Sequence, residues 1–178
     1  MFISMNKIIF VISMFFLIMR STFASQATYE GNKRCRVCHM KQKAGMIYEK
    51  WQDSEHARAY EDLNEEEKKN PFCLKCHVTG YNEPVSPGIE ANDLLGVQCE
   101  ACHGPGSLYK NVEIMNEGEY KRNYSIQRKK AIQVGLILPT EDTCKKCHNQ
   151  ESPHYKPFVY KIAYPKIKHL IPRRYLGE

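Results

Sequence analysis

The feature that most constrains this chain of 178 residues is a five-residue pattern, C-x-x-C-H, which occurs four times. Its copies are Cys35-Arg36-Val37-Cys38-His39, Cys73-Leu74-Lys75-Cys76-His77, Cys99-Glu100-Ala101-Cys102-His103 and Cys144-Lys145-Lys146-Cys147-His148. This pattern is the attachment signature of c-type haem, in which two thiols form thioethers with the porphyrin and the histidine binds iron. On a helical turn, positions i, i+3 and i+4 share one face, so the three side chains reach one porphyrin. The sequence therefore predicts four covalently bound haem c groups.

Zinc binding and disulfides are the alternative uses of paired cysteines, since eight cysteines could build two four-cysteine zinc sites. Such sites do not require a histidine after each second cysteine. Here all four pairs have one, although histidine makes up only 7 of the 178 residues. Every cysteine belongs to one of the four motifs. We therefore interpret the motifs as haem sites.

The first 27 residues have the features of a secretory signal peptide. Lys7 gives a basic start, and the apolar run that follows is shorter than the roughly 20 residues that span a bilayer. Small residues lie two positions before Ala24 and Ala27, in Thr22-Phe23-Ala24 and Ser25-Gln26-Ala27, which predicts cleavage after one of these alanines and a tetrahaem domain over 28–178. An uncleaved anchor is the alternative. With the leader cleaved, we expect no stable membrane span and a periplasmic or otherwise exported protein.

The formal net charge of +6 is no argument for nucleic acid as a partner. Cleavage of the leader removes Lys7 and Arg20. Four haems would add about eight propionate charges, offset in part by the ferric irons, and bound groups of this kind belong in the count. The mature holoprotein is therefore expected to be near neutral when oxidised, and no nucleic-acid partner is predicted.

The mature part is polar and short of aliphatic residues for its length, so it would build a poor ordinary core. Four large apolar porphyrins would supply the missing surface. We therefore predict a mainly α fold, a multihaem cytochrome c with short helices and loops wrapped around four covalently attached haems.

A long helix is predicted from Lys33 to Leu63, because Ala44, Ile47 and Trp51 recur at helical spacing. His56 continues the same apolar stripe and is therefore expected to face inward. A single inward histidine is usually a satisfied core residue. In a chain with four irons and few spare histidines, a distal iron ligand is the better interpretation.

Shorter local signals predict where other helices begin and end. Asn64 with Glu67 resembles a capping box, and Thr140 is expected to start the helix of the fourth motif. Ser125 is expected to cap a helix that runs to Val134. Gly104 is expected to end the helix of the third motif abruptly.

The histidines are too few to give every iron two imidazole ligands. Four of the seven are proximal, and the remaining three are His56, His154 and His169. At least one iron therefore has a methionine, some other ligand, or nothing on its distal side. The thioethers outside the leader are Met40, Met46 and Met115. Met40 directly follows a proximal histidine and is badly placed, so Met115 is the candidate that we retain.

These motifs together resemble the cytochrome c-554 family of tetrahaem electron carriers, from Tyr29 to about His169. The most specific pieces are Trp51 with Ser54-Glu55-His56-Ala57, the stretch CLKCHVTGY, the stretch GVQCEACHGPG, and CKKCH followed by a Ser-Pro and aromatic tail. The resemblance implies a mainly helical protein with haems in closely stacked pairs, three of them bis-histidine and one five-coordinate.

The resemblance also implies that His56 and His169 are distal ligands and that the haem of His77 is the open one. One distal histidine of the family, about ten residues beyond the histidine of its CHGPG stretch, has no counterpart in this sequence. Glu113 stands at that position, and Met115 is close by. Either Met115 or His154 takes its place, or two haems are open.

Three functions fit these features. The first is a periplasmic electron carrier that relays electrons between other redox proteins, which dock transiently, and this favours a role that is not enzymatic. The second is a small reductase of nitric oxide, nitrite or hydroxylamine at a five-coordinate haem. The third is a subunit of an extracellular cytochrome filament, which would make the protein a homo-oligomer.

Overall fold

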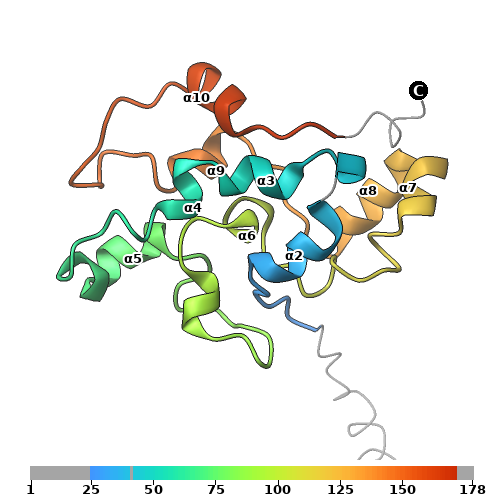
Figure 1. The fold of residues 1–178 in the computed structure, drawn as a ribbon, viewed down its shortest axis with the longest axis horizontal. Helices are drawn as coiled ribbons and strands as arrows, with labels where there is room; N and C mark the ends of the chain where they lie inside the picture. Colours follow the sequence, from blue (N-terminus) through green and yellow to red (C-terminus); the bar gives the residue numbers. More distant parts are fainter. Residues whose placement is uncertain (1–24, 41, 172–178) are drawn as a thin grey trace, which may run out of the picture.

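The computed structural model of this chain describes residues 25–40 and 42–171 (Figure 1). Nearly all of the predicted signal peptide, residues 1–24, therefore lies outside the described residues. In the part that is described, no helix has the length and apolar character needed to cross a membrane.

Short helices joined by long loops make up the described chain. The α-helices are α2 (Asn32–His39), α3 (Ile47–Gln52), α4 (Glu55–Arg58), α5 (Pro71–His77), α6 (Cys99–His103), α7 (Glu117–Arg122), α8 (Tyr124–Gln133), α9 (Glu141–Lys145) and α10 (Tyr160–Ile167). Three 3-10 turns accompany them: η1 (Gln42–Ala44), η2 (Glu67–Lys69) and η3 (Ala91–Leu94). The β-structure of the described residues consists of isolated bridges, such as Tyr29 with Val85. The predicted mainly α fold is confirmed.

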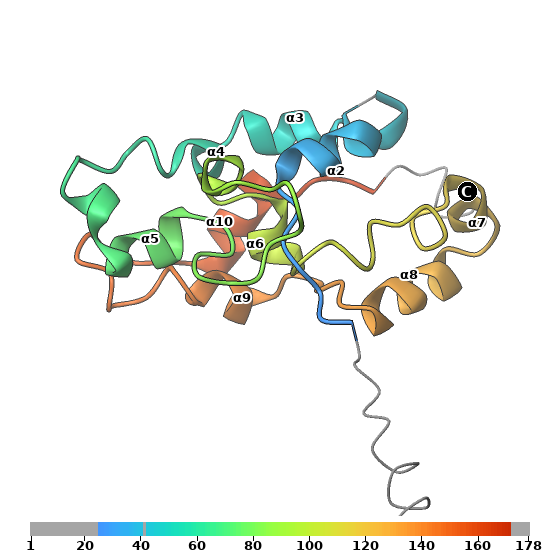
Figure 2. The ribbon, with the colours of Figure 1, turned by 90° about the horizontal axis from the view of Figure 1, so that it is seen from below.

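The molecule is elongated, with the helix of the third motif near its centre. Figures 1 and 2 place α6 centrally, α5 at one end, and α7 with α8 at the other end. The segment between α9 and α10 runs out to the α5 end and back. The chain thus brings α10 and residues 168–171 back toward the middle of the molecule.

The prediction of a single helix over residues 33–63 is wrong. The stretch contains α2, η1, α3 and α4 instead. Gly45 and Met46 both have positive φ angles, of 83° and 53°, which turn the chain sharply before α3. Glycine adopts this conformation freely, so Gly45 indicates the break in the helix. The apolar periodicity continues across this break and therefore does not reveal it.

The predictions of where shorter helices start and end were more accurate. Asn64 and Glu67 do form a cap, since the Asn64 Oδ1 accepts from the Glu67 backbone N–H at 3.0 Å and a Glu67 carboxylate oxygen accepts from the Asn64 N–H at 2.9 Å. Thr140 is the N-cap of α9, and Gly104 ends α6 with a φ of 77°. The cap of α8 is Asn123 rather than Ser125, because the Asn123 side chain accepts from the Ile126 N–H.

The buried interior is unusually polar. Its large polar side chains include Gln98, Glu100 and Gln127, whose exposed fractions are 1% to 3%. The buried apolar side chains of the described residues are Ala44, Tyr48, Leu63, Leu94, Tyr109 and Ala131. One consequence is that hydrogen bonds, rather than an aliphatic core, join the segments around α6.

Glu100 is the centre of this polar interior. Its carboxylate accepts hydrogen bonds from the backbone N–H groups of Glu30, Gly31 and Gly106, at 2.6 to 3.1 Å. Gln98 accepts from the Asn32 N–H at 2.7 Å. These bonds hold the start of α2 against α6, so the first and third motifs lie side by side.

Candidate haem centres

Each of the four motifs lies on or directly after a short helix. The helices α2, α5 and α6 end at His39, His77 and His103. The helix α9 ends at Lys145, and the fourth motif continues from it into the following turns. A helical turn therefore presents the cysteines and histidine of each motif on one side, as the spacing predicts.

A cavity of about 2100 Å³ runs through the molecule between these helices. All four proximal histidines line it, together with His56, His169 and Met115. Ordinary small-molecule pockets have volumes of about 300–1,000 Å³, so this cavity suits a much larger ligand or several ligands. Apolar side chains that are otherwise exposed also face it, among them Val37, Ile162 and Leu170, with exposed fractions of 74%, 64% and 73%.

Two of the proximal histidines are oriented by backbone carbonyl groups. The Nδ1 of His103 lies 3.0 Å from the Ile137 carbonyl oxygen, and the Nδ1 of His77 contacts the Ala59 carbonyl oxygen. A proton on Nδ1 that is donated in this way leaves Nε2 as the metal-binding nitrogen. This arrangement is typical of metal-ligating histidines.

Two histidine pairs face each other across the cavity. The ring centroids of His56 and His148 are 5.9 Å apart, and those of His103 and His169 are 5.8 Å apart. Two imidazoles that bind one metal ion from opposite sides, with bonds of about 2.0 Å, have ring centroids roughly 6 Å apart. Both pairs therefore fit a six-coordinate iron between two imidazoles.

The electrostatics favour the neutral imidazole, which is the form that binds metal. Burial lowers the pKa of His56 and His103, and it lowers the pKa of His169 to about 4 with help from the nearby His103 and His39. A ring nitrogen of His169 is also buried with no hydrogen-bond partner in the described part of the chain. A buried imidazole of this kind fits a metal ligand.

His154 lines the same cavity as the other candidates but is much more exposed than a buried ligand. His154 has a side chain that is 78% exposed, and its Nε2 lies 3.1 Å from a carboxylate oxygen of Glu67. In the part of the chain that the structure describes, the ring contacts pair neither His39 nor His77 with another histidine. Two proximal histidines thus face the cavity without a histidine opposite.

Cysteines from different motifs approach one another. Cys35 and Cys99 lie close enough for the interaction between their thiols to raise the pKa of Cys35 and lower that of Cys99, and the same interaction raises the pKa of Cys147 and lowers that of Cys76. Cys144 is close enough to Cys102 to help burial raise the pKa of the Cys102 thiol to about 11. Within residues 25–40 and 42–171, no cluster of three or more His, Cys, Asp or Glu side chains could hold one metal ion.

Three features of these sites were not predicted from the sequence. Phe158 stacks on the ring of His148, with centroids 4.7 Å apart. The carbonyl groups of Ala59 and Ile137 orient histidines, and a backbone group carries no sequence signal. Glu100 occupies a variable position of its motif, so its structural role is visible only from its three hydrogen-bond donors.

The arrangement fits haem c in the chemistry of its donors as well as in size. Each motif offers two thiols and an imidazole on one face, and the shared cavity has largely apolar walls. When bound, haem iron would take up or release one electron at a time. The residues that would hold it are the eight motif cysteines and the histidines described above.

Comparison with known proteins agrees with this interpretation. Residues 34–104 match the model of the family described as cytochrome c554 and c-prime. Cytochrome c-554 of Nitrosomonas europaea is 29% identical over 164 residues, which cover 81% of this chain and 68% of that protein. The reduced-state structure of cytochrome c554 from Nitrosomonas europaea matches with a TM-score of 0.49 and 24% identity, over 80% of this chain and 79% of that one. The sequence identity makes this chain similar to cytochrome c-554, and residues 34–104 are the part that matches the family model.

Proposed function

We propose that this protein is an exported tetrahaem c-type cytochrome that relays electrons between redox partners. The observation that carries the proposal is the proximity of cysteines from different motifs. The neighbouring cysteines are Cys35 and Cys99, Cys102 and Cys144, and Cys147 and Cys76, since in each pair one thiol influences the pKa of the other. Because each cysteine holds one edge of a porphyrin, these pairs order the haems by their proximal ligands as His39, His103, His148 and His77.

The side chains of the chain supply what a relay needs. The cysteine contacts keep neighbouring porphyrin edges close, and the rate of electron tunnelling falls steeply with distance. The residues that would bind the irons of the two central haems are His56 with His148 and His103 with His169. An iron with two protein ligands passes electrons without binding a substrate. The apolar cavity walls keep water away from the irons.

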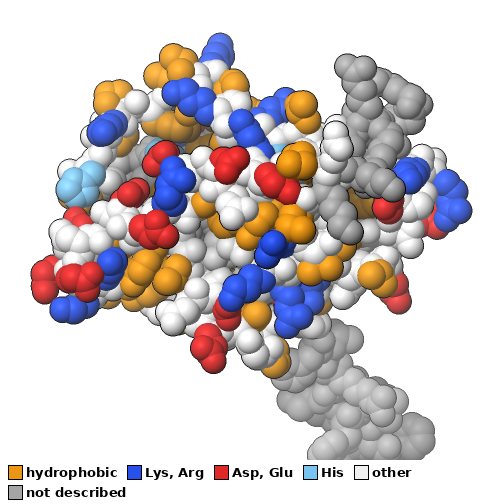
Figure 3. Space-filling model, viewed as in Figure 1, with side chains coloured by type: hydrophobic (Ala, Val, Ile, Leu, Met, Phe, Trp, Pro, Cys, Tyr) orange, Lys and Arg blue, Asp and Glu red, His pale blue; other side chains and the backbone are white. Residues whose placement is uncertain are grey.

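The surface suits transient docking of redox partners. Figure 3 shows Lys and Arg side chains interspersed with Asp and Glu side chains on one face of the molecule. Charged rims of this kind steer encounter and set specificity more than they add affinity. The partner would be another redox protein with a small interface.

The first experiment measures haem content and electron equilibration in the exported holoprotein. We expect four haems per chain by pyridine haemochrome. When a rapid pulse of reductant supplies less than one electron per protein molecule, we expect the electron to spread over several haems of that molecule. This internal spreading is expected to be faster than electron transfer between two protein molecules. If the rate at which the electron redistributes among the haems depended on protein concentration, an internal relay would be contradicted.

A reductase is the second candidate, because of the environment of His77. Its ring contacts a backbone carbonyl group, and the spare histidine His154 is turned toward Glu67 instead. A haem at this motif would keep one axial position open for a small molecule. Sustained turnover of nitric oxide, nitrite or hydroxylamine by the reduced holoprotein would favour this function over a carrier.

A cytochrome filament is the third possibility, and it depends on self-association. The exposed His154 would then be free to reach a haem of another copy. Size-exclusion chromatography of the holoprotein separates the two cases, because the proposed carrier elutes as a small species at all concentrations.

A further inference from the structure

We propose that Met115 is the second axial ligand of the haem attached at Cys35 and Cys38, opposite His39. The inference rests on the proposed function, since it requires a haem at the first motif. It assigns a His/Met haem to one end of the relay and two His/His haems to the middle.

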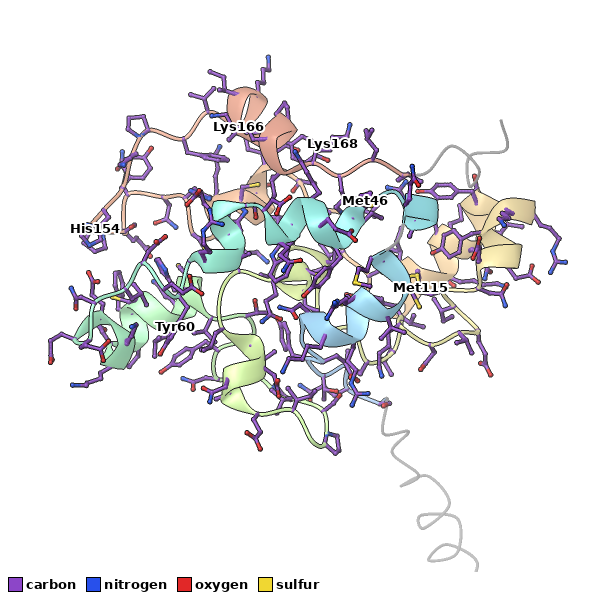
Figure 4. The ribbon with its side chains drawn as sticks, in the orientation of Figure 1. Met46, Tyr60, Met115, His154, Lys166 and Lys168 are labelled. Atoms are coloured by element: carbon purple, nitrogen blue, oxygen red, sulfur yellow. The ribbon has the colours of Figure 1, made fainter. Side chains whose placement is uncertain are left out.

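The first step is the allocation of the histidines. His56 lies opposite His148, and His169 lies opposite His103, with centroid distances of 5.9 and 5.8 Å. His154 is the one histidine left over, and it is exposed and paired with Glu67. Figure 4 shows His154 at one end of the molecule and Met115 toward the other. No histidine therefore remains for His39.

The second step compares the three thioethers outside the leader. The Met40 sulfur accepts a hydrogen bond from the Arg36 Nε at 2.8 Å, on the exposed side of α2. Met46 is 45% exposed and is absent from the cavity lining among the described residues. Met115 is half-buried and lines the same cavity as His39. Among the described residues, Met115 is thus the one of the three thioethers that lines the cavity, so it is the one available to a haem there.

The third step shows that Met115 is held in place. The buried Gln127 of α8 reaches the carbonyl oxygens of Glu113 and Ile114, at 3.5 and 3.3 Å. The Met115 N–H donates to the Asn111 carbonyl oxygen at 2.7 Å. The next residue, Asn116, caps α7 by accepting from the Glu119 N–H. The backbone on both sides of Met115 is therefore anchored, as a residue that serves as a ligand requires.

A functional consequence follows for the direction of electron flow. Replacement of an axial imidazole by a thioether raises the reduction potential of a haem. The haem of His39 is therefore expected to have a higher potential than the two His/His haems. Electrons that enter elsewhere would collect at this end of the relay.

The decisive experiment is proton NMR of the holoprotein after reduction and saturation with carbon monoxide, which leaves every iron diamagnetic. An axial methionine methyl lies over the porphyrin, and its three-proton singlet is shifted far upfield of all other resonances. We expect one such singlet in the wild type and in Met46→Leu, the matched control. We expect it to be lost in Met115→Leu, where bound carbon monoxide rises from one to two per chain.

A conservative variant guards against misfolding. In Met115→His, we expect the singlet to be lost, four haems to stay attached, carbon monoxide binding to remain at one per chain, and one haem potential to fall. The absence of the singlet from the wild type, or its persistence in Met115→Leu, would overturn the assignment. Fewer than four haems in the wild type would instead refute the proposed function, so the two failures are distinguishable.

Discussion

The imidazole side chains show how single residues acquire a role from their surroundings. Burial lowers the pKa of His39 and His148 as well as those of the paired histidines, whereas His154 stays exposed beside Glu67. In the sequence, His56, His154 and His169 have the same status, because each lies outside the four C-x-x-C-H motifs. Their depth in the molecule distinguishes them, since His56 and His169 are buried beside other histidines and His154 is exposed.

This difference predicts distinct spectra for three alanine variants of the holoprotein. His56→Ala and His169→Ala are each expected to convert one haem from low-spin to high-spin, because each removes one of two facing imidazoles. His154→Ala is the matched control and is expected to leave the spin states unchanged. Electron paramagnetic resonance and carbon monoxide titration measure the number of converted haems. If the number of low-spin haems were unchanged in His56→Ala, His56 would not be an iron ligand.

Glu100 illustrates a different use of burial at the residue scale. Burial raises the pKa of its carboxyl group, while the N–H groups of Gly106, Gly31 and Glu30 oppose that rise. With 1% exposure, the side chain gives three buried donors their acceptor. An unsatisfied buried donor costs about 1–3 kcal/mol, so this one residue carries much of the contact between α2 and α6.

We therefore expect Glu100→Ala to lower the free energy of unfolding of the holoprotein by about 3 kcal/mol or more. The matched control is Glu65→Ala, which removes a surface carboxylate that is 81% exposed and paired with Lys68. Its effect is expected to stay within about 0.5 kcal/mol. Guanidinium titration followed by circular dichroism measures both, and equal effects would contradict the role of Glu100.

At the scale of elements, the turn that ends α6 couples two parts of the chain. Gly104 has a φ of 77°, and a Cβ atom there would lie 2.9 Å from the Gly135 carbonyl oxygen. The adjacent loop returns to the motif, since the Ile137 N–H donates to the His103 carbonyl oxygen at 2.8 Å. A side chain at Gly104 would thus push away the loop that orients the His103 imidazole.

The glycines of this fold offer a matched pair for a test. Gly88 has a similar φ of 79°, but a Cβ atom there would meet no atom within 4 Å. Gly88→Ala is expected to cost about 1–2 kcal/mol from the left-handed backbone alone. Gly104→Ala is expected to cost more, and also to broaden the spectrum of one low-spin haem. Equal losses of stability in the two variants would show that the contact with Gly135 is unimportant.

At the scale of the whole molecule, the described chain has little apolar core of its own. Six apolar residues are buried among the described residues, whereas many exposed apolar side chains face the cavity. Each large buried apolar side chain contributes about 1.5–3 kcal/mol. Ordering the backbone costs about 1–2 kcal/mol for every residue. With so few buried apolar side chains among the described residues, we expect the fold to depend on large apolar groups in the cavity.

We accordingly expect the haem-free chain, with all eight motif cysteines replaced by serine, to lack a folded state. Its far-ultraviolet circular dichroism is expected to show little helix, and heating is expected to give no cooperative transition. The holoprotein at the same concentration is the control. A cooperative transition in the haem-free chain would show that the polar interior around Glu100 suffices for folding.

The sequence by itself determined the haem motifs, the mainly α character, the similarity to cytochrome c-554 and several helix ends. These features depend on residues that are neighbours in the chain, such as the spacing of Cys99, Cys102 and His103 or the cap at Asn64. The long helix over 33–63 failed because an apolar repeat does not report a positive φ. Gly45 and Met46 break that repeat without changing its pattern.

Only the tertiary structure decided which residues face one another. His56 belongs with His148, which is far away in the sequence, and His169 belongs with His103. The same holds for Cys35 with Cys99, for Glu100 with the start of α2, and for the exposed position of His154. Spacing along the chain cannot give such pairs, because they result from loops that bring distant segments together around a shared cavity.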